Sequence, residues 1–167
     1  MKMEPTVSTY LGIDPGLNRT GYSLLQRSPD GPILLEGGIL TANRMQSLAA
    51  RVHEIGEGLR EIITEFSPDT IALERIFSFG PNPKTAITMA HLRGAFLLIA
   101  TDFGVPVVDY SPTQIKRLLT GSGKATKEQM QAAVQNELRL KRVPEPHDVA
   151  DATAVALCLY HSVRFAA

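Results

Sequence analysis

The chain has 167 residues, of which 44% are hydrophobic and 20% charged, and its formal net charge is zero. This composition predicts one compact domain over residues 1–167 and excludes a disordered chain. The longest apolar stretch, near residues 95–100, is too short to span a bilayer, and residues 1–8 lack the apolar core of a signal peptide. A single cysteine, Cys158, excludes an internal disulfide. We therefore expect a cytoplasmic protein without membrane association.

The first part of the chain predicts three antiparallel strands. Residues 9–13 form a short apolar run that ends at Asp14, followed by a Pro-Gly turn signal. Residues 21–26 and 33–40 look like two further strands, and the loop between them contains Pro-Asp-Gly, which favours a hairpin. A three-stranded meander follows from these short connections.

The rest of the chain alternates helices and strands. The pattern predicts a helix over 48–66, a strand over 70–73, a helix over about 82–103, a strand over 105–108, and helices over 112–119, 126–138 and 147–163. Residues 126–129, from Thr126 to Gln129, resemble a capping box at the start of the helix over 126–138. The helix over 82–103 is apolar on more than one face, so we expect it inside the fold or against a partner subunit. The order of elements predicts an α/β fold, a five-stranded mixed sheet with three antiparallel strands first, flanked by helices.

Four acidic residues stand where such a fold would gather them. Asp14 and Glu74 each follow an apolar strand, so both emerge at one edge of the sheet if those strands are neighbours. Asp148 and Asp151 lie three residues apart in the first turn of the last helix and share one face. Singly, Asp14 could be a turn residue, Glu74 could pair with an arginine, and the other two could cap the helix. Together they predict a site for divalent cations such as Mg²⁺, which in pairs catalyse phosphoryl transfer.

Charge is unevenly distributed along the chain. Residues 111–142 carry seven basic and two acidic residues, whereas the segments on both sides are net acidic. A basic segment beside cation-binding carboxylates suits a protein that holds phosphates. A solvated helical face would show the same pattern, and the charges alone leave both readings open.

Five blocks of sequence follow one another along the chain: YLGIDPG with TGY from residue 10, IALERIF from 71, VPV with YSP from 105, QIK, GSG and ATK from 114, and HDVADA from 147. In their sequence and order these blocks resemble the RuvC family of Holliday junction resolvases, over about residues 8–163. The resemblance implies a ribonuclease H-like fold and a homodimer. It also implies Mg²⁺-dependent nicking of opposed strands of a four-way DNA junction, in recombination and repair, with the branch-migration proteins RuvA and RuvB as partners.

By the same resemblance, the metal ligands are Asp14, Glu74, Asp148 and Asp151. They would hold two Mg²⁺ ions per subunit, for which Mn²⁺ would substitute. A metal-activated water would attack the phosphodiester, and a 3′-hydroxyl would leave. His147 stands next to a ligand position at which some relatives have histidine, so it is an auxiliary candidate for acid–base chemistry.

Residues implied to contact DNA flank the acids. Phe77 matches an aromatic residue that stacks at the junction centre, and Lys116 and Lys127 match lysines on phosphates near the cut. Lys124 lies in the same basic segment. Arg75 departs from the glutamine common in the family, and it could pair with the preceding glutamate or reach DNA.

Three other functions stay open at this point. One is a ribonuclease H-like nuclease acting on RNA or DNA ends, a second is a non-catalytic junction-binding protein, and the third is an actin-like ATP-binding protein. The chain has no Walker-type phosphate loop to support the third. Dimerisation would favour the resolvase, and Arg93 with Gly94 matches a pair that the family uses at its dimer interface. The loop over 78–83 looks about one residue longer than is usual in the family. This loop is expected to approach the DNA junction.

Overall fold

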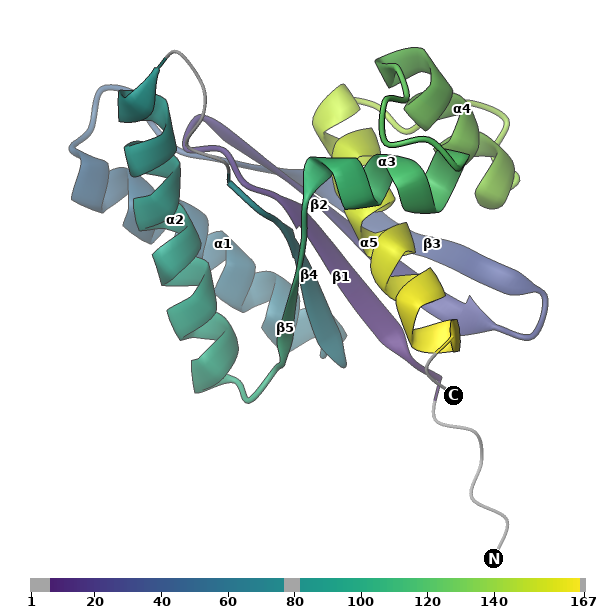
Figure 1. Ribbon diagram of the computed structural model, residues 1–167. Helices are drawn as coiled ribbons and strands as arrows, with labels where there is room; N and C mark the ends of the chain where they lie inside the picture. The colour runs from purple at the N-terminus through teal and green to yellow at the C-terminus, as the bar shows by residue number, and fades with distance from the viewer. Residues whose placement is uncertain (1–6, 77–81, 166–167) are drawn as a thin grey trace, which may run out of the picture.

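The computed structural model describes residues 7–76 and 82–165. Its elements are β1 (Thr9–Asp14), β2 (Arg19–Ser28), β3 (Gly31–Thr41), α1 (Leu48–Phe66), β4 (Thr70–Glu74), α2 (Pro83–Asp102), β5 (Val107–Tyr110), α3 (Pro112–Thr120), α4 (Lys127–Glu137) and α5 (His147–Phe165). The sheet order is β3-β2-β1-β4-β5, with β1, β2 and β3 antiparallel and β1, β4 and β5 parallel (Figure 1). The predicted mixed sheet with three antiparallel strands first is confirmed.

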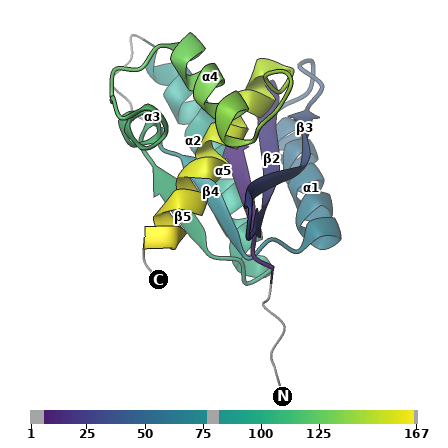
Figure 2. The same ribbon diagram turned by 90° about the vertical axis from the view of Figure 1, so that its right-hand side faces the viewer.

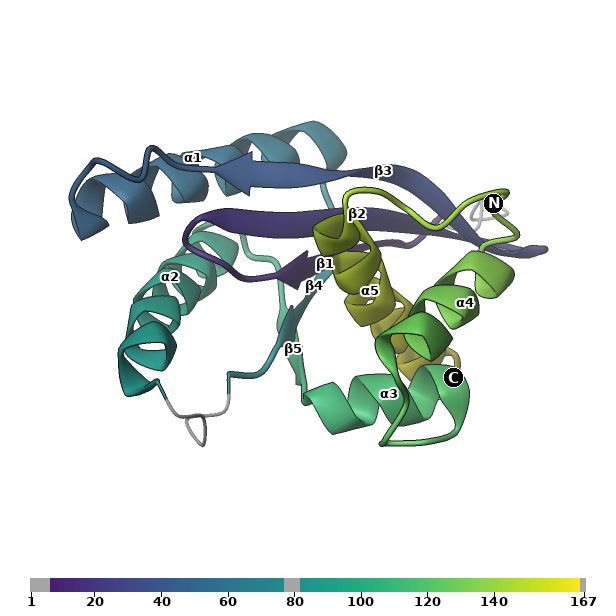
Figure 3. The same cartoon turned by 90° about the horizontal axis from the view of Figure 1, so that it is seen from above.

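Helices cover both faces of this sheet. α1 and α2 lie on one face; α5 lies on the other, and α3 and α4 pack against α5 (Figure 2 and Figure 3). In β1, Leu11 and Ile13 belong to the core with α1 and α2, whereas Tyr10 belongs to the core with α5. This alternation explains why a strand buried on both faces reads as one apolar run. In the described part of the chain, no helix is long and apolar enough to cross a membrane.

α5 lies directly on two glycines of the sheet. A Cβ built on Gly12 would lie 2.3 Å from the carbonyl oxygen of Ala152, and one built on Gly21 would lie 2.1 Å from that of Asp148. Both distances are far inside van der Waals contact, so the approach of helix to strand requires residues without a side chain. The hydroxyl of Thr153 also donates a 2.8 Å hydrogen bond to Ser23. The start of α5 is therefore fixed against β1 and β2.

Three strands differ from their predicted bounds by two residues or more at one end. β2 was expected at 21–26 and is Arg19–Ser28. β5 was expected at 105–108 and is Val107–Tyr110, because the N–H of Val105 donates to the carbonyl of Ala100 (2.9 Å) and closes the turn after α2. β3 was expected at 33–40 and is longer at both ends. The hairpin closes tightly, with Ser28 paired to Gly31, so the pairing continues into the expected loop.

Candidate active site

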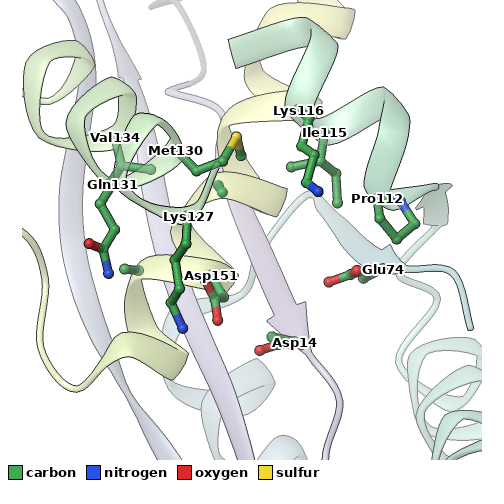
Figure 4. Close-up of a pocket in the computed structure, with 12 residues that line it drawn as sticks. Asp14, Glu74, Pro112, Ile115, Lys116, Lys127, Met130, Gln131, Val134 and Asp151 are labelled. Atoms are coloured by element: carbon green, nitrogen blue, oxygen red, sulfur yellow. The ribbon is translucent and has the colours of Figure 1, made fainter. Parts of the chain in front are cut away.

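The carboxyl ends of β1 and β4 place two of the predicted acids side by side. The two strands are parallel neighbours with Ile13 opposite Leu73, so Asp14 and Glu74 follow at the same edge of the sheet. Asp151 reaches this edge from the beginning of α5. The three carboxylates line one cavity of about 330 Å³ (Figure 4).

Burial and mutual repulsion disfavour the ionised forms of these acids. Burial, followed by the charges of the other three predicted acids with Glu74 first, raises the pKa of Asp14 from 3.8 to about 7. Burial is also the main cause that raises the pKa values of Glu74 and Asp151. The charge of Lys127 acts against the shifts of both aspartates, and that of Lys116 acts against the shift of Glu74. A cation placed in this cavity would relieve the repulsion.

Asp148 stands beside this cavity rather than in its wall. Its Oδ2 lies 2.9 Å from Nη2 of Arg19; the side chain of Asp148 is 18% exposed and that of Arg19 is 40% exposed, so water reaches the arginine side of the ion pair. His147 is exposed, and its Nε2 lies 3.9 Å from Oδ1 of Asp148. The structure thus gathers three of the four acids and holds the fourth on an arginine that the sequence pattern did not single out. The only signal for Arg19 was a cation in the turn five residues after Asp14.

The donor set of the cavity suits a hard divalent cation, because such ions take carboxylate oxygens as ligands. Over residues 7–76 and 82–165, no three acidic, histidine or cysteine side chains converge on one metal position. The carboxylates stand around the wall of the cavity, where burial first and neighbouring acids second raise the pKa values of Asp14, Glu74 and Asp151. Oxygen-only donors with excess negative charge fit Mg²⁺ or Mn²⁺ better than a thiolate-preferring metal.

Two lysines face the carboxylates across the cavity. Lys116 comes from α3, and Lys127 is the first residue of α4 (Figure 4). The predicted capping box at α4 is confirmed. The hydroxyl of Thr126 accepts from the N–H of Gln129 at 3.2 Å, and Oε1 of Gln129 accepts from the N–H of Thr126 at 2.9 Å. This cap fixes the turn that carries Lys127 over the acids.

Two other predicted DNA contacts, Lys124 and Arg75, lie apart from this cavity. Lys124 is exposed in the turn between α3 and α4. Arg75 is exposed and lines a different cavity, next to α2, and among the described residues it forms no ion pair with Glu74. Phe77 lies outside the described residues, as does most of the 78–83 loop.

Comparisons with known proteins match nearly the whole chain. The family model described as crossover junction endodeoxyribonuclease RuvC matches residues 10–159. The crossover junction endodeoxyribonuclease RuvC of Rhodopirellula baltica is 46% identical over 153 residues, which cover 92% of this chain and 86% of the relative. The structure of Thermus thermophilus RuvC has a TM-score of 0.87 at 32% identity and covers 95% of this chain and 96% of its own. The same protein in complex with a Holliday junction substrate has a TM-score of 0.89, with the same identity and coverage.

The matched segment runs from the start of β1 to within α5 and contains all four predicted acids. The structural matches confirm the ribonuclease H-like fold that the sequence resemblance implied. The resemblance itself is confirmed at identities well above 30% over most of the chain. This chain belongs to the RuvC family of crossover junction endodeoxyribonucleases.

Proposed function

We propose that the protein resolves four-way (Holliday) DNA junctions by paired symmetric nicks in homologous recombination and DNA repair. The observation that carries the proposal is the single cavity in which three carboxylates from β1, β4 and α5 face two lysines from α3 and α4. Carboxylates suit divalent cations, and lysines suit phosphates. Family membership supports a DNA junction as the substrate, since T. thermophilus RuvC has been solved with a Holliday junction substrate.

The proposed ligands of two Mg²⁺ ions per subunit, for which Mn²⁺ substitutes, are Asp14, Glu74, Asp148 and Asp151. When bound there, such ions would supply an activated water and would stabilise the charge that develops on a phosphodiester during its hydrolysis, with a 3′-hydroxyl as the leaving group. Asp148 contacts Arg19 through Oδ2, which leaves Oδ1 as the oxygen available to an ion. His147, 3.9 Å from Asp148, is a candidate to move a proton at the edge of the site.

The proposed DNA surface extends outward from the acids. Lys116 and Lys127 hold phosphates next to the cut, where both already face the cavity. Lys124 and Arg75, both exposed, extend the contact along the backbone. Phe77, three residues after Glu74, is proposed to stack on bases at the junction centre.

Paired nicks require two active sites, and we propose that α2 forms the interface of a homodimer. The helix exposes large apolar side chains, with Ile87 59%, Leu97 38% and Leu98 63% exposed. Beside it lies a mostly apolar cavity of about 730 Å³. Arg93 is neutralised at this surface by an ion pair with Asp109. An apolar surface of this kind is typical of contacts between subunits.

A charge in this surface should separate the subunits. Leu97→Asp is expected to convert the protein to a monomer and to lower the rate of paired nicking about a hundredfold, because an unpaired carboxylate at an apolar interface is costly. Analytical ultracentrifugation and junction cleavage measure the two effects. Leu35→Asp, at a similarly exposed leucine (44%) on β3, is the matched control and should remain dimeric. A dimeric Leu97→Asp, or a monomeric wild type, would contradict the proposed interface.

We further propose that residues 1–167 act as one nuclease domain in the cytoplasm. Its partners there would be the branch-migration proteins RuvA and RuvB. The net basic segment over 111–142 and the exposed lysines within it support contact with DNA.

The direct test is cleavage of a synthetic four-way junction with Mg²⁺ or Mn²⁺. The wild type is expected to nick two opposed strands at symmetric positions and to leave a linear duplex of the same sequence nearly uncut. Glu74→Gln should slow cleavage at least about a hundredfold, whereas Glu61→Gln, on the exposed side of α1, should not. Equal cleavage of junction and duplex, or an inactive wild type with both metals, would overturn the proposed function.

A further inference from the structure

A second cavity opens next to the carboxylates, on the side of the sheet away from α3 and α4. It has a volume of about 450 Å³ and lies between the β1–β2 turn, the first turn of α1 and the start of α2. We call it the basic cavity, because its lining includes three cations and no acidic residue: Arg19, Arg51 and Lys84. In Figure 1 the β1–β2 turn, the start of α2 and the start of α5 all lie along the upper edge of the sheet.

The β1–β2 turn in this cavity is held in place by its own hydrogen bonds. The hydroxyl of Thr20 accepts from the N–H of Gly16 at 3.2 Å and donates to its carbonyl at 2.8 Å. Nη2 of Arg51 donates to Oδ1 of Asn18 at 2.5 Å and to the carbonyl of Leu17 at 3.4 Å. With its oxygen engaged, Asn18 retains its amide N–H groups as donors. The turn is therefore a rigid support for a ligand.

Two donors of the basic cavity have no acceptor among the residues that the structure describes. Nε of Arg51 is buried and has no hydrogen-bond partner among the described residues. Such a group is costly to leave unpaired, and a bound anion would satisfy it. Lys84 is exposed in the first turn of α2 and forms no ion pair within the described part of the chain.

The start of α2 adds donors to the same cavity. The N-cap residue Asn82 makes no side-chain hydrogen bond to the helix, so the first backbone N–H groups are not capped by it. The hydroxyls of Thr85 and Thr88 also line the cavity. Arg19 is paired with Asp148, whereas Arg51 and Lys84 have no carboxylate partner among the described residues. Two such cations, free donors and a positive helix end form a site for a tetrahedral oxyanion, of which phosphate is the form that DNA supplies.

We propose that the basic cavity binds a backbone phosphate of the DNA strand that passes through the active site. The inference rests on the proposed function, because it takes the DNA strand as the source of the phosphate. The cavity adjoins the catalytic edge, since Gly16 is two residues from Asp14 and Arg19 contacts Asp148. The strand would then be held on both sides of the cut, by Lys116 and Lys127 on one side and by Arg51 and Lys84 on the other.

The first test measures junction binding by Asp14→Asn protein, which should not cut the DNA, over a range of salt concentrations. Adding Lys84→Ala or Arg51→Ala is expected to weaken binding several-fold at low salt and to reduce the slope of log affinity against log salt by about 0.9 each. Lys84→Arg should retain the parent slope. Arg60→Ala is the control for net charge, since Arg60 pairs with Asp102 at the far end of α2.

The second test identifies the phosphate. Junctions in which single phosphates are replaced by uncharged methylphosphonates should show one or two positions near the cut where affinity falls. At those positions Lys84→Ala should cause no further loss of affinity, because the effects of removing the two partners of one contact are not additive. If Lys84→Ala keeps the parent affinity and slope, or if its loss adds fully at every position, the inference is wrong. If the wild-type protein cuts junctions normally in that case, the inference fails but the proposed function stands.

Discussion

Replacing Asp14 with asparagine is expected to slow junction cleavage at least about a thousandfold, a loss of about 4 kcal/mol of transition-state stabilisation, without weakening junction binding. Asp14 ends β1 and lines the cavity with Glu74 and Asp151. The amide keeps the shape of the side chain but loses the charge that attracts a divalent cation. Binding should persist or tighten, because one negative charge is removed from a surface that meets phosphates. Single-turnover cleavage and equilibrium binding of a labelled junction separate the two effects.

The same substitution should stabilise the metal-free protein at alkaline pH. Because the pKa of folded Asp14 is raised from 3.8 to about 7, its contribution to stability is fully present below pH 3.8 and is lost as the pH rises through about 7. Asparagine does not titrate, so the variant should exceed the wild type in free energy of unfolding by on the order of a few kcal/mol at about pH 8, and by little at about pH 4. Mg²⁺ should reduce the difference in free energy of unfolding between the variant and the wild type at about pH 8. Denaturant titrations at both pH values measure it.

Asp30→Asn is the matched control for this prediction. Asp30 lies in the exposed turn between β2 and β3, far from the site, and its replacement removes the same formal charge. It should change neither the cleavage rate nor the dependence of stability on pH. If Asp14→Asn cuts junctions at the wild-type rate, the carboxylate cavity is not where the chemistry takes place.

Gly21→Ala should lower both the folding stability and the cleavage rate, although it adds only one methyl group. The new Cβ would lie 2.1 Å from the carbonyl oxygen of Asp148, a backbone atom that cannot rotate away. The start of α5 has to move, and overpacking of this kind costs about 1–3 kcal/mol of folding free energy or more. Movement of α5 also displaces Asp148 and Asp151, and a misplacement of about 1 Å can lower the rate by about a hundredfold. Thermal unfolding and single-turnover cleavage at a temperature where the variant is folded separate the two losses.

Gly56→Ala is the matched control for Gly21→Ala. Gly56 is also buried, but it lies in α1, and a Cβ there meets only the tip of the Ile99 side chain, at 3.1 Å. A side chain can adjust where a backbone cannot, and alanine favours the helix by up to about 1 kcal/mol. We expect this variant to be close to wild type in stability and in rate. Equal behaviour of Gly21→Ala and Gly56→Ala would contradict the role assigned to the close helix–strand contact.

The sequence was informative where function depends on local pattern. The apolar run over residues 9–13 and the acid at its end predicted both β1 and the position of Asp14, because an apolar run and its end are local features of the sequence. The sequence placed Asp14 beside Glu74 only if β1 and β4 were neighbours. In the structure the two strands are paired in parallel. The capping box at Thr126 was also readable, since its partners are three residues apart.

What the sequence could not predict depends on contacts between distant residues. The ion pair of Arg19 with Asp148 joins the start of β2 to α5, and no spacing rule connects the two positions. The donors of the basic cavity come from three separate elements for the same reason. The start of β5 was misplaced because a hydrogen bond between Val105 and Ala100 extends the preceding turn. Phe77 remains a prediction, since it lies outside the described residues.

The order of the acids along the chain has a consequence for synthesis. Asp14 and Glu74 are translated early, whereas Asp148 and Asp151 arrive on α5, which also covers Gly12 and seals one face of the sheet. A growing chain therefore carries only half of the site until this helix has docked. Nuclease activity should appear only when the fold is complete, so partly made or truncated chains that lack α5 pose little danger to the genome.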